Sequence, residues 1–516
     1  MTDSMAAESR MQERVFAWLG DAAAHPNVHR IDTHAASVFL EGNRALKIKR
    51  AIRFPFLDYS TLEKRKAACE EEIRINHPFA PQIYHRAVAI TQSADGSLDI
   101  DGNGRPVEYA VEMTRFDERQ TIDHLAAAGP LDADLVEAMA AAIAASHDVA
   151  PLVPAEPWIN SIPGIIEGNT TGFRDATCFS TGDVDDLRQA SLSAFARIRG
   201  VLEQRGRQGY VRRCHGDLHL ANIVLIDRKP VLFDAIEFDA TMASTDVLYD
   251  LAFPLMDLVR YGRQAAANAL LNRYLALTAS ENLDALATLP LFLSLRAAIR
   301  AHVLIARLGR NARDSDDIMR SARAYFELAR QTIVPPAPVL VAIGGLSGTG
   351  KSVLARALAP KILPQPGAVV LRSDVLRKQL FQVSEMDRLP ESAYRSEITE
   401  QIYEILVQRA ARVLAQGHSV VADAVFAREA ERAAAQDAAR KHNIRFVGLF
   451  LVADLATRLS RVGRRARDAS DATPDVAGLQ ENYKIGAIDW TVIDASGTPE
   501  QTLMQCESRI ADCKTA

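Results

Sequence analysis

One octapeptide constrains the fold of this chain more than any other feature. Residues 345–352 read Gly-Leu-Ser-Gly-Thr-Gly-Lys-Ser, which fits the pattern G-x-x-x-x-G-K-[ST], and they follow the apolar run 339–343. A strand that enters a helix through a glycine-rich turn directs backbone N–H groups, the helix N-terminus and a lysine at phosphate oxygens. The sequence therefore predicts a phosphate-binding loop (Walker A motif, P-loop) in a parallel α/β sheet.

Each kind of residue in this loop has its own expected role in binding MgATP. The glycines allow the backbone to turn around the phosphates, Lys351 adds a positive charge at the transferred group, and Ser352 offers an oxygen to Mg²⁺. The residues expected to hold the nucleotide are Gly345, Ser347, Gly348, Thr349, Gly350, Lys351 and Ser352.

Two acidic residues follow later strands of the same sheet. Asp423 ends the strand-like run 418–422 and is expected to hold Mg²⁺ as the Walker B carboxylate, the alternative being a cap of the next helix. Asp374, which lies between Arg372 and Arg377, is expected to accept a hydroxyl proton while the arginines hold a substrate anion. The alternative for this second cluster is a helix N-cap beside solvated arginines.

A group of arginines near the C-terminus adds a possible lid. Five of them fall within ten residues, which fits either a solvated helix face or a lid that supplies charge to a phosphoryl-transfer transition state. We favour the lid, and within it Arg461 and Arg465 are the predicted nucleotide contacts. The five are Arg458, Arg461, Arg464, Arg465 and Arg467.

These features together resemble the P-loop kinases of small molecules and of 5′-hydroxyl ends, an AAA-type group that includes gluconate-kinase-like and polynucleotide-kinase-like enzymes. The resemblance covers residues 339–516. It implies ATP binding far more specifically than it implies any acceptor.

A second motif lies in the first half of the chain. Residues 215–222 read His-Gly-Asp-Leu-His-Leu-Ala-Asn, so Asn222 follows Asp217 at the spacing of the protein-kinase catalytic loop, and Asp234 comes after a short strand. Asp217 would accept the acceptor proton, while Asn222 and Asp234 would bind Mg²⁺ on the ATP phosphates. His215 is expected to make a structural hydrogen bond, and the alternative for the whole motif is a turn with core histidines.

This motif resembles the aminoglycoside phosphotransferase family, whose fold is protein-kinase-like, over residues 25–330. The resemblance implies a small-lobe lysine that contacts the ATP phosphates and pairs with a helix glutamate. Lys47 is chosen over Lys49, while Glu71 and Glu72 stay open as the partner. It also implies that backbone near Glu112 and Met113 meets adenine.

Two departures argue against protein substrates. No G-x-G-x-x-G precedes Lys47, and Ala235-Ile236 stands where protein kinases have Phe-Gly after the metal-binding aspartate.

The predicted fold class is an α+β, protein-kinase-like bilobal domain followed by an α/β P-loop domain with a parallel sheet. The expected divisions are a strand-rich small lobe (1–115), a helical large lobe with the catalytic loop (116–330), a proline-rich linker (331–338) and the P-loop domain (339–516).

Composition fits a globular protein and excludes several other classes. The chain has 516 residues, 48% of them hydrophobic, and a net charge of −5, so bulk attraction to nucleic acid is disfavoured. Its five cysteines form no C-x-x-C pair. Neither a signal peptide nor a long uncharged apolar run is visible, which favours a cytoplasmic protein away from membranes.

The sequence thus predicts a bifunctional kinase that uses ATP and Mg²⁺ and transfers phosphate to small hydroxylated acceptors at two sites. Two alternatives remain at this point. The P-loop domain could sense nucleotide without transferring phosphate, or it could phosphorylate 5′-hydroxyl ends of nucleic acid.

Overall fold

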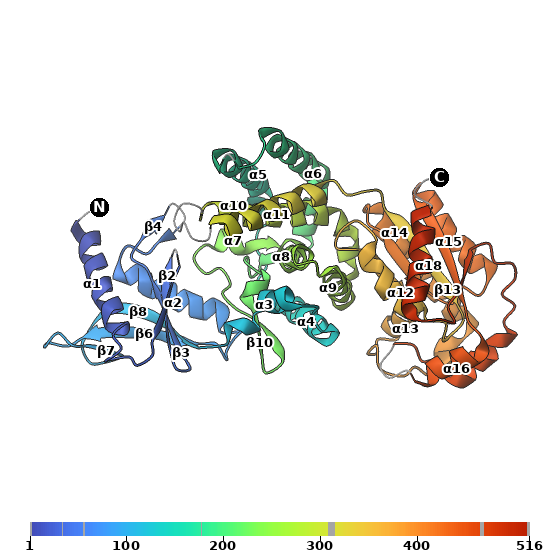
Figure 1. Ribbon diagram of the computed structural model, residues 1–516, viewed down its shortest axis with the longest axis horizontal. Helices are drawn as coiled ribbons and strands as arrows, with labels where there is room; N and C mark the ends of the chain where they lie inside the picture. Colours follow the sequence, from blue (N-terminus) through green and yellow to red (C-terminus); the bar gives the residue numbers. More distant parts are fainter. Residues whose placement is uncertain are drawn as a thin grey trace. The chain divides into compact units, whose positions relative to one another are not determined.

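The computed structural model describes residues 3–33, 35–54, 57–176, 178–307, 315–464 and 469–512 (Figure 1). They form two compact units, one from residues 1–164 and 199–257 and the other from residues 165–198 and 258–516. The divisions expected from the sequence, at 115/116 and 331–338, stay predictions.

A six-stranded antiparallel sheet forms the N-terminal part of the first unit, in the order β1-β2-β3-β8-β6-β7. The predicted strands between residues 37 and 113 are all present, and β1 is an addition. Lys47 pairs with Val38 of β2 and Val111 of β8, which places it inside the sheet. The strands are β1 (His29–Asp32), β2 (Ala36–Glu41), β3 (Arg44–Lys49), β6 (Tyr84–Gln92), β7 (Leu98–Ile100) and β8 (Arg105–Thr114).

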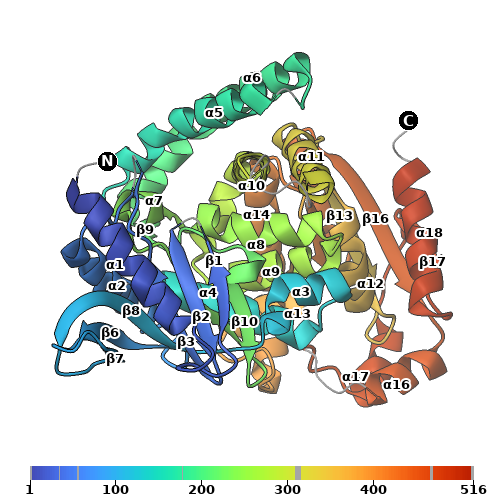
Figure 2. The same cartoon turned by 60° about the vertical axis from the view of Figure 1, so that its left-hand side comes forward.

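Two apolar clusters cover this sheet. Helix α1 (Asp3–Leu19), which the sequence analysis did not predict, buries Val15 and Phe16 against strand residues that include Leu46 (Figure 2). A second cluster joins Cys69 of α2 (Leu62–Asn76) to other strand residues and to the hairpin described next. Helix α2 therefore lies close to both the lysine-bearing strand and the catalytic hairpin.

The second motif lies between short strands of the first unit. Strand β9 (Val211–Arg213) pairs with β12 (Ser244–Asp246), and β10 (Ile223–Ile226) pairs with β11 (Lys229–Leu232), so the predicted hairpin is confirmed. The helices along this stretch of the chain are α3 (Ile122–Ala128), α4 (Ala133–Val149), α5 (Glu156–Ala176), α6 (Thr181–Arg207), α7 (Ala240–Ala243) and α8 (Val247–Arg260). Helix α5 from residue 165, α6 up to residue 198 and α8 from residue 258 belong to the second unit.

The second unit contains a five-stranded sheet in the order β14-β15-β13-β16-β17, with every neighbouring pair parallel. Four strands are those predicted, and β17 is an addition. Leu354 and Leu358 of the helix after β13 pack with Cys506 of the last helix in the core beneath the sheet. The strands are β13 (Val339–Gly345), β14 (Val369–Arg372), β15 (Val420–Asp423), β16 (Arg445–Val452) and β17 (Thr491–Asp494).

The helices around this sheet follow the predicted alternation. They are α12 (Lys351–Leu358), α13 (Ser373–Leu380), α14 (Ser396–Ala415), α15 (Glu429–Lys441), α16 (Leu455–Gly463), α17 (Pro474–Leu479) and α18 (Pro499–Asp512). The predicted order of fold classes is confirmed: an α+β part with an antiparallel sheet precedes an α/β part with a parallel sheet.

Three more helices of the second unit precede its sheet: α9 (Gln264–Leu277), α10 (Leu289–Ile305) and α11 (Ser315–Ile333). The helical run Ser280–Ile305 is long and apolar enough to cross a membrane, but 61% of its most apolar window is buried. A core helix passes the same test, and α10 packs along α11.

Candidate active sites

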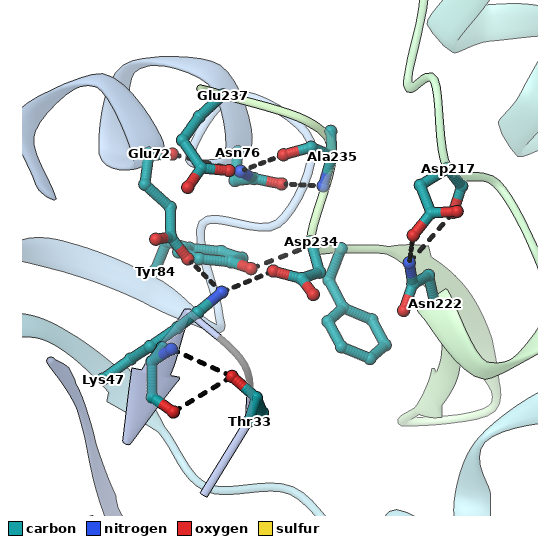
Figure 3. A network of polar contacts seen from close by, with 12 residues as sticks. Thr33, Lys47, Glu72, Asn76, Tyr84, Asp217, Asn222, Asp234, Ala235 and Glu237 are labelled. Atoms are coloured by element: carbon teal, nitrogen blue, oxygen red, sulfur yellow. Dashed lines mark hydrogen bonds and ion pairs between the residues drawn. The ribbon is translucent and has the colours of Figure 1, made fainter. Parts of the chain in front are cut away.

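The small-lobe lysine and its glutamate are held together in the first unit. Lys47 Nζ lies 2.8 Å from Glu72 Oε1 and 2.5 Å from Asp234 Oδ1 (Figure 3). Although burial acts to lower the pKa of Lys47, the two carboxylates raise it well above its usual value, so the lysine is a fixed cation. It reaches both the helix glutamate and the expected metal ligand.

The structure shows which of the two glutamates, Glu71 or Glu72, pairs with Lys47. Glu72 is fully buried, and its Oε2 also forms an ion pair with Lys49 Nζ at 2.5 Å, whereas Glu71 pairs with Arg74. Consecutive helix residues lie about 100° apart, so only one of them can face the sheet. Glu71 as a nucleotide-site residue is therefore corrected.

Lys49 has a separate position. It pairs with Glu237 as well as with Glu72, and its side chain is 3% exposed. Asp239, five residues after Asp234, caps α7 by accepting the Thr241 N–H at 2.7 Å.

The segment that carries Asp234 is held in an uncommon conformation. Asp234 has φ +62°, its N–H donates to Tyr84 Oη at 3.0 Å, and the next N–H, of Ala235, donates to Asn76 Oδ1 at 2.8 Å. A left-handed backbone at a non-glycine residue persists only where its surroundings fix it. Tyr84 and Asn76 supply that support, and no motif in the sequence marked them.

The catalytic loop brings the other predicted groups together. Asn222 Nδ2 donates to the Asp217 backbone oxygen at 2.9 Å and to Asp217 Oδ2 at 3.3 Å (Figure 3). This leaves Asn222 Oδ1, together with Asp234, as oxygen donors that fit Mg²⁺. The structural role expected of His215 is confirmed, because its Nε2 bonds to Phe233 O at 2.9 Å, and burial lowers its pKa so that the ring is neutral.

A buried aspartate anchors this loop from α8. Asp250 Oδ1 accepts the Gly216 N–H at 2.9 Å, and Oδ2 lies 3.2 Å from His147 Nε2. His147, Cys214 and Asp250 are close enough to share a metal ion. Because both oxygens of Asp250 already have protein partners, we assign this cluster to support of the loop.

The adenine contact expected near Glu112 and Met113 needs correction. Both residues lie inside β8, paired with β3 on one side and β6 on the other, and the Glu112 side chain pairs with Arg44 at 2.8 Å. The sheet uses their backbone groups. The chain leaves it only after Arg115, whose N–H still donates to Asn43 O at 2.8 Å.

The phosphate loop of the second unit has the backbone that its glycines predict. Gly345, Gly348 and Gly350 have φ of +134°, +88° and +94°. Ser347 N–H donates to Gln480 Oε1 at 2.7 Å, Thr349 Oγ1 donates to Leu346 O at 2.9 Å, and Lys351 Nζ bonds to the same Leu346 oxygen at 3.2 Å.

The predicted metal ligands of this loop meet. Ser352 Oγ lies 2.6 Å from Asp423 Oδ2, and Arg372 Nε lies 3.2 Å from the same oxygen. Helix α15 takes Arg428 as its N-cap, so Asp423 does not cap it. A hydroxyl and a carboxylate at the edge of the loop fit a hard cation such as Mg²⁺.

Asp374 lies with the loop in one cavity of about 1290 Å³. Burial, followed by the nearby Asp423 carboxylate, raises the pKa of Asp374, and Arg372 and Lys351 oppose this. Asp374 does not cap α13, because the N-cap is Arg372. The cavity exceeds the ~300–1,000 Å³ of a typical ligand pocket, which leaves space for an acceptor beside a nucleotide. Residues on the Asp374 side of it include Arg377, Thr399, Tyr403 and Glu431.

The lid prediction is corrected for one arginine. Arg458 is 2% exposed and donates to Ser347 O at 2.9 Å and Ala477 O at 2.9 Å, so it braces the loop. Arg461 lines the cavity and donates to the carbonyls of Ala495 and Gly497, each at 2.7 Å. Arg465 lies outside the described residues.

Comparison with known proteins finds similar sequences for the P-loop part and for the chain as a whole. A family model described as an AAA domain matches residues 340–481. An uncharacterized protein of Mycobacterium tuberculosis (strain ATCC 25618 / H37Rv) is 28% identical over 486 residues, which are 92% of this chain and 93% of that protein. The similarity to this relative therefore extends over both units.

Solved structures match each part separately. A choline/ethanolamine kinase family protein from Mesorhizobium loti matches at 14% identity and a TM-score of 0.38, covering 63% of this chain and 95% of that chain. A gluconokinase from Sinorhizobium meliloti 1021 matches at 16% identity and a TM-score of 0.26, covering 34% of this chain and 93% of that chain.

Proposed function

We propose that the chain is a bifunctional phosphotransferase that uses MgATP at two sites and phosphorylates a small hydroxylated acceptor at each. One observation carries the proposal: each unit has a carboxylate close to the side chains that we propose as its Mg²⁺ ligands. Asp217 and Asp374 are these carboxylates. A kinase-like domain and a P-loop kinase domain in one chain support ATP as the donor.

At the first site Lys47, fixed by Glu72, would bind and orient the ATP phosphates. Asn222 and Asp234 would hold Mg²⁺, which supplies charge stabilisation to the transferred group. Asp217 would take the proton of the acceptor hydroxyl as oxygen attacks the γ-phosphorus, and ADP would leave. The Asn222 amide keeps Asp217 in place through its hydrogen bonds.

At the second site the loop N–H groups and Lys351 would surround the phosphates, with Ser352 and Asp423 as the Mg²⁺ ligands. Asp374 would receive the acceptor proton there. Its raised pKa makes it a stronger base than an ordinary aspartate. Arg372, whose Nε lies 3.2 Å from Asp423 Oδ2, would balance the negative charge of that carboxylate.

A screen of hydroxylated metabolites tests the proposal, with ATP-dependent gain of one phosphoryl mass as the readout. Wild type, Asp217→Ala and Lys351→Ala are compared. We expect each variant to lose one product and keep the other. Products that depend on Asp217 alone would favour a nucleotide-sensing P-loop domain, while Lys351-dependent labelling of DNA or RNA 5′ ends would favour the end-kinase alternative. Full activity in the double variant would exclude both sites.

A further inference from the structure

The edge of the P-loop sheet is capped by side chains from outside it. Strand β14 is the first strand in the sheet order, so it has a neighbouring strand, β15, on one side. Val369 N–H donates to Ser419 O at 2.9 Å on that side. Backbone groups alternate in direction along a strand, so Ala368 O and Val370 N–H point away from β15.

Helix α9 supplies the partners for these groups. Asn272 Oδ1 accepts the Val370 N–H at 2.7 Å, and Asn272 Nδ2 donates to Ala368 O at 3.2 Å. One side-chain amide thus makes the two bonds that one residue of a parallel neighbouring strand would make. Asn268, one turn earlier and buried, donates to Ala368 O at 3.0 Å.

The helix itself is tied to the P-loop part by further contacts. Arg273, the residue after Asn272, pairs with Glu385 at 2.7 Å. Asp284, beyond the end of α9, pairs with Arg412 of α14 at 2.7 Å. These two ion pairs therefore hold in place the helix that carries Asn268 and Asn272.

Strand β14 leads directly to reactive groups. Arg372 is its last residue, and Asp374 lies in the first turn of α13, which begins without a loop. Val370 is two residues before Arg372, so a shift of the strand edge moves the base relative to the phosphate loop. A misplacement of about 1 Å at a catalytic group can cost about 100-fold in rate.

We propose that Asn272 is a positioning residue of the P-loop site, and that through β14 it sets the place of Asp374 opposite the transferred phosphate. This rests on the proposed function of that site. The hydrogen bonds of Asn272 among the described residues go to Asn268, Ala368 and Val370, none of which we assign to the nucleotide or the metal. Its helix precedes the P-loop motif by about seventy residues in the sequence. A protein chain that began at residue 339 would lack the hydrogen bonds from Asn272 to the edge of β14.

Hydrogen exchange on the full chain tests the structural step. Asn272→Leu keeps the size of the side chain and removes both bonds, and Gln264→Leu makes the same kind of change at the start of the same helix. We expect exchange in peptide 368–375 to quicken roughly fivefold to thirtyfold in Asn272→Leu, the factor for one or two hydrogen bonds. Exchange of peptide 345–352 should stay unchanged in both variants. Unchanged exchange of 368–375 would overturn the proposal.

Kinetics test the functional step. For Lys351-dependent transfer we expect Asn272→Leu to lower kcat about 10-fold to 100-fold, to leave the Kd for MgATP unchanged, and to shift the acid limb of the pH profile. Asn272→Asp retains an acceptor for the Val370 N–H, so its kcat should fall less than that of Asn272→Leu. This variant tests the inference if the leucine variant folds poorly. A wild-type chain without Lys351-dependent transfer would refute the proposed function; normal kcat in Asn272→Leu beside active wild type would refute this inference alone.

Discussion

Lys47 Nζ lies 2.5 Å from Oδ1 of Asp234, so the lysine assigned to the ATP phosphates is paired with the carboxylate assigned to Mg²⁺. MgATP would bring a cation to the carboxylate and anions to the lysine at the same time. The pair can therefore exchange partners without leaving the partly buried lysine or the carboxylate without an opposite charge. Glu72 holds the lysine from the other side at 2.8 Å.

Removing the charge of Glu72 should lower both the free energy of unfolding and the rate of phosphoryl transfer at the first site. Glu72→Gln leaves the buried Lys49 and the partly buried Lys47 with a weaker partner, and breaking a buried ion pair costs about 3–5 kcal/mol. Glu71→Gln is the matched control, because its partially exposed pair with Arg74 should contribute less than about 1 kcal/mol. Urea unfolding and Asp217-dependent transfer measure both effects. Equal losses in the two variants would contradict the assignment of Glu72.

Asp217→Asn should retain ATP binding at the first site and lose transfer. Removing a positioned base costs about 10²–10⁴-fold in kcat. The amide has nearly the size of the carboxylate, so the loop and its bonds to Asn222 should persist. Steady-state kinetics of both products, with ATP affinity by calorimetry, check this. Transfer at the wild-type rate would assign Asp217 to loop structure.

Much of both sites could be predicted because their residues come in short runs with fixed spacing. The segments 345–352 and 215–222 each bring several groups together within one turn, and the structure keeps them together. Asp423 and Asp234 could be predicted because each follows a recognisable strand, whose end marks where the side chain emerges.

Other residues could not be predicted because their roles depend on contacts between distant segments. Glu71 and Glu72 differ only in the rotation of α2 toward the sheet. Met113 is the next-to-last residue of β8, and an apolar run does not mark where a strand ends. Asn272 meets Val370 across 98 positions of sequence, and no local pattern announces that contact.

Acid should stop the P-loop reaction at a higher pH than an ordinary aspartate would allow. Transfer needs ionised Asp374, and burial followed by the Asp423 carboxylate raises its pKa above the usual 3.8. Activity should therefore fall as the pH drops through the raised value and recover above it. The pH profile of Lys351-dependent transfer, measured in the Asp217→Asn background, tests this. Asp374→Asn should bind MgATP and transfer almost nothing; a profile without an acid limb would mean that another group takes the proton.

A methyl group at Gly348 should disable the P-loop site and leave the first site intact. A Cβ there would lie 2.6 Å from Arg458 O, and the residue has φ +88°, which side chains rarely adopt. The loop must then move, at a cost of about 1–3 kcal/mol for the backbone strain alone. Gly463→Ala is the matched control, because a Cβ at that helix position meets nothing within 4 Å. We expect Gly348→Ala to weaken Lys351-dependent MgATP binding at least about tenfold, which calorimetry measures, while Asp217-dependent transfer stays at the wild-type level. Equal ATP affinity in the two glycine variants would mean that the close approach of Arg458 to the loop does not set its shape.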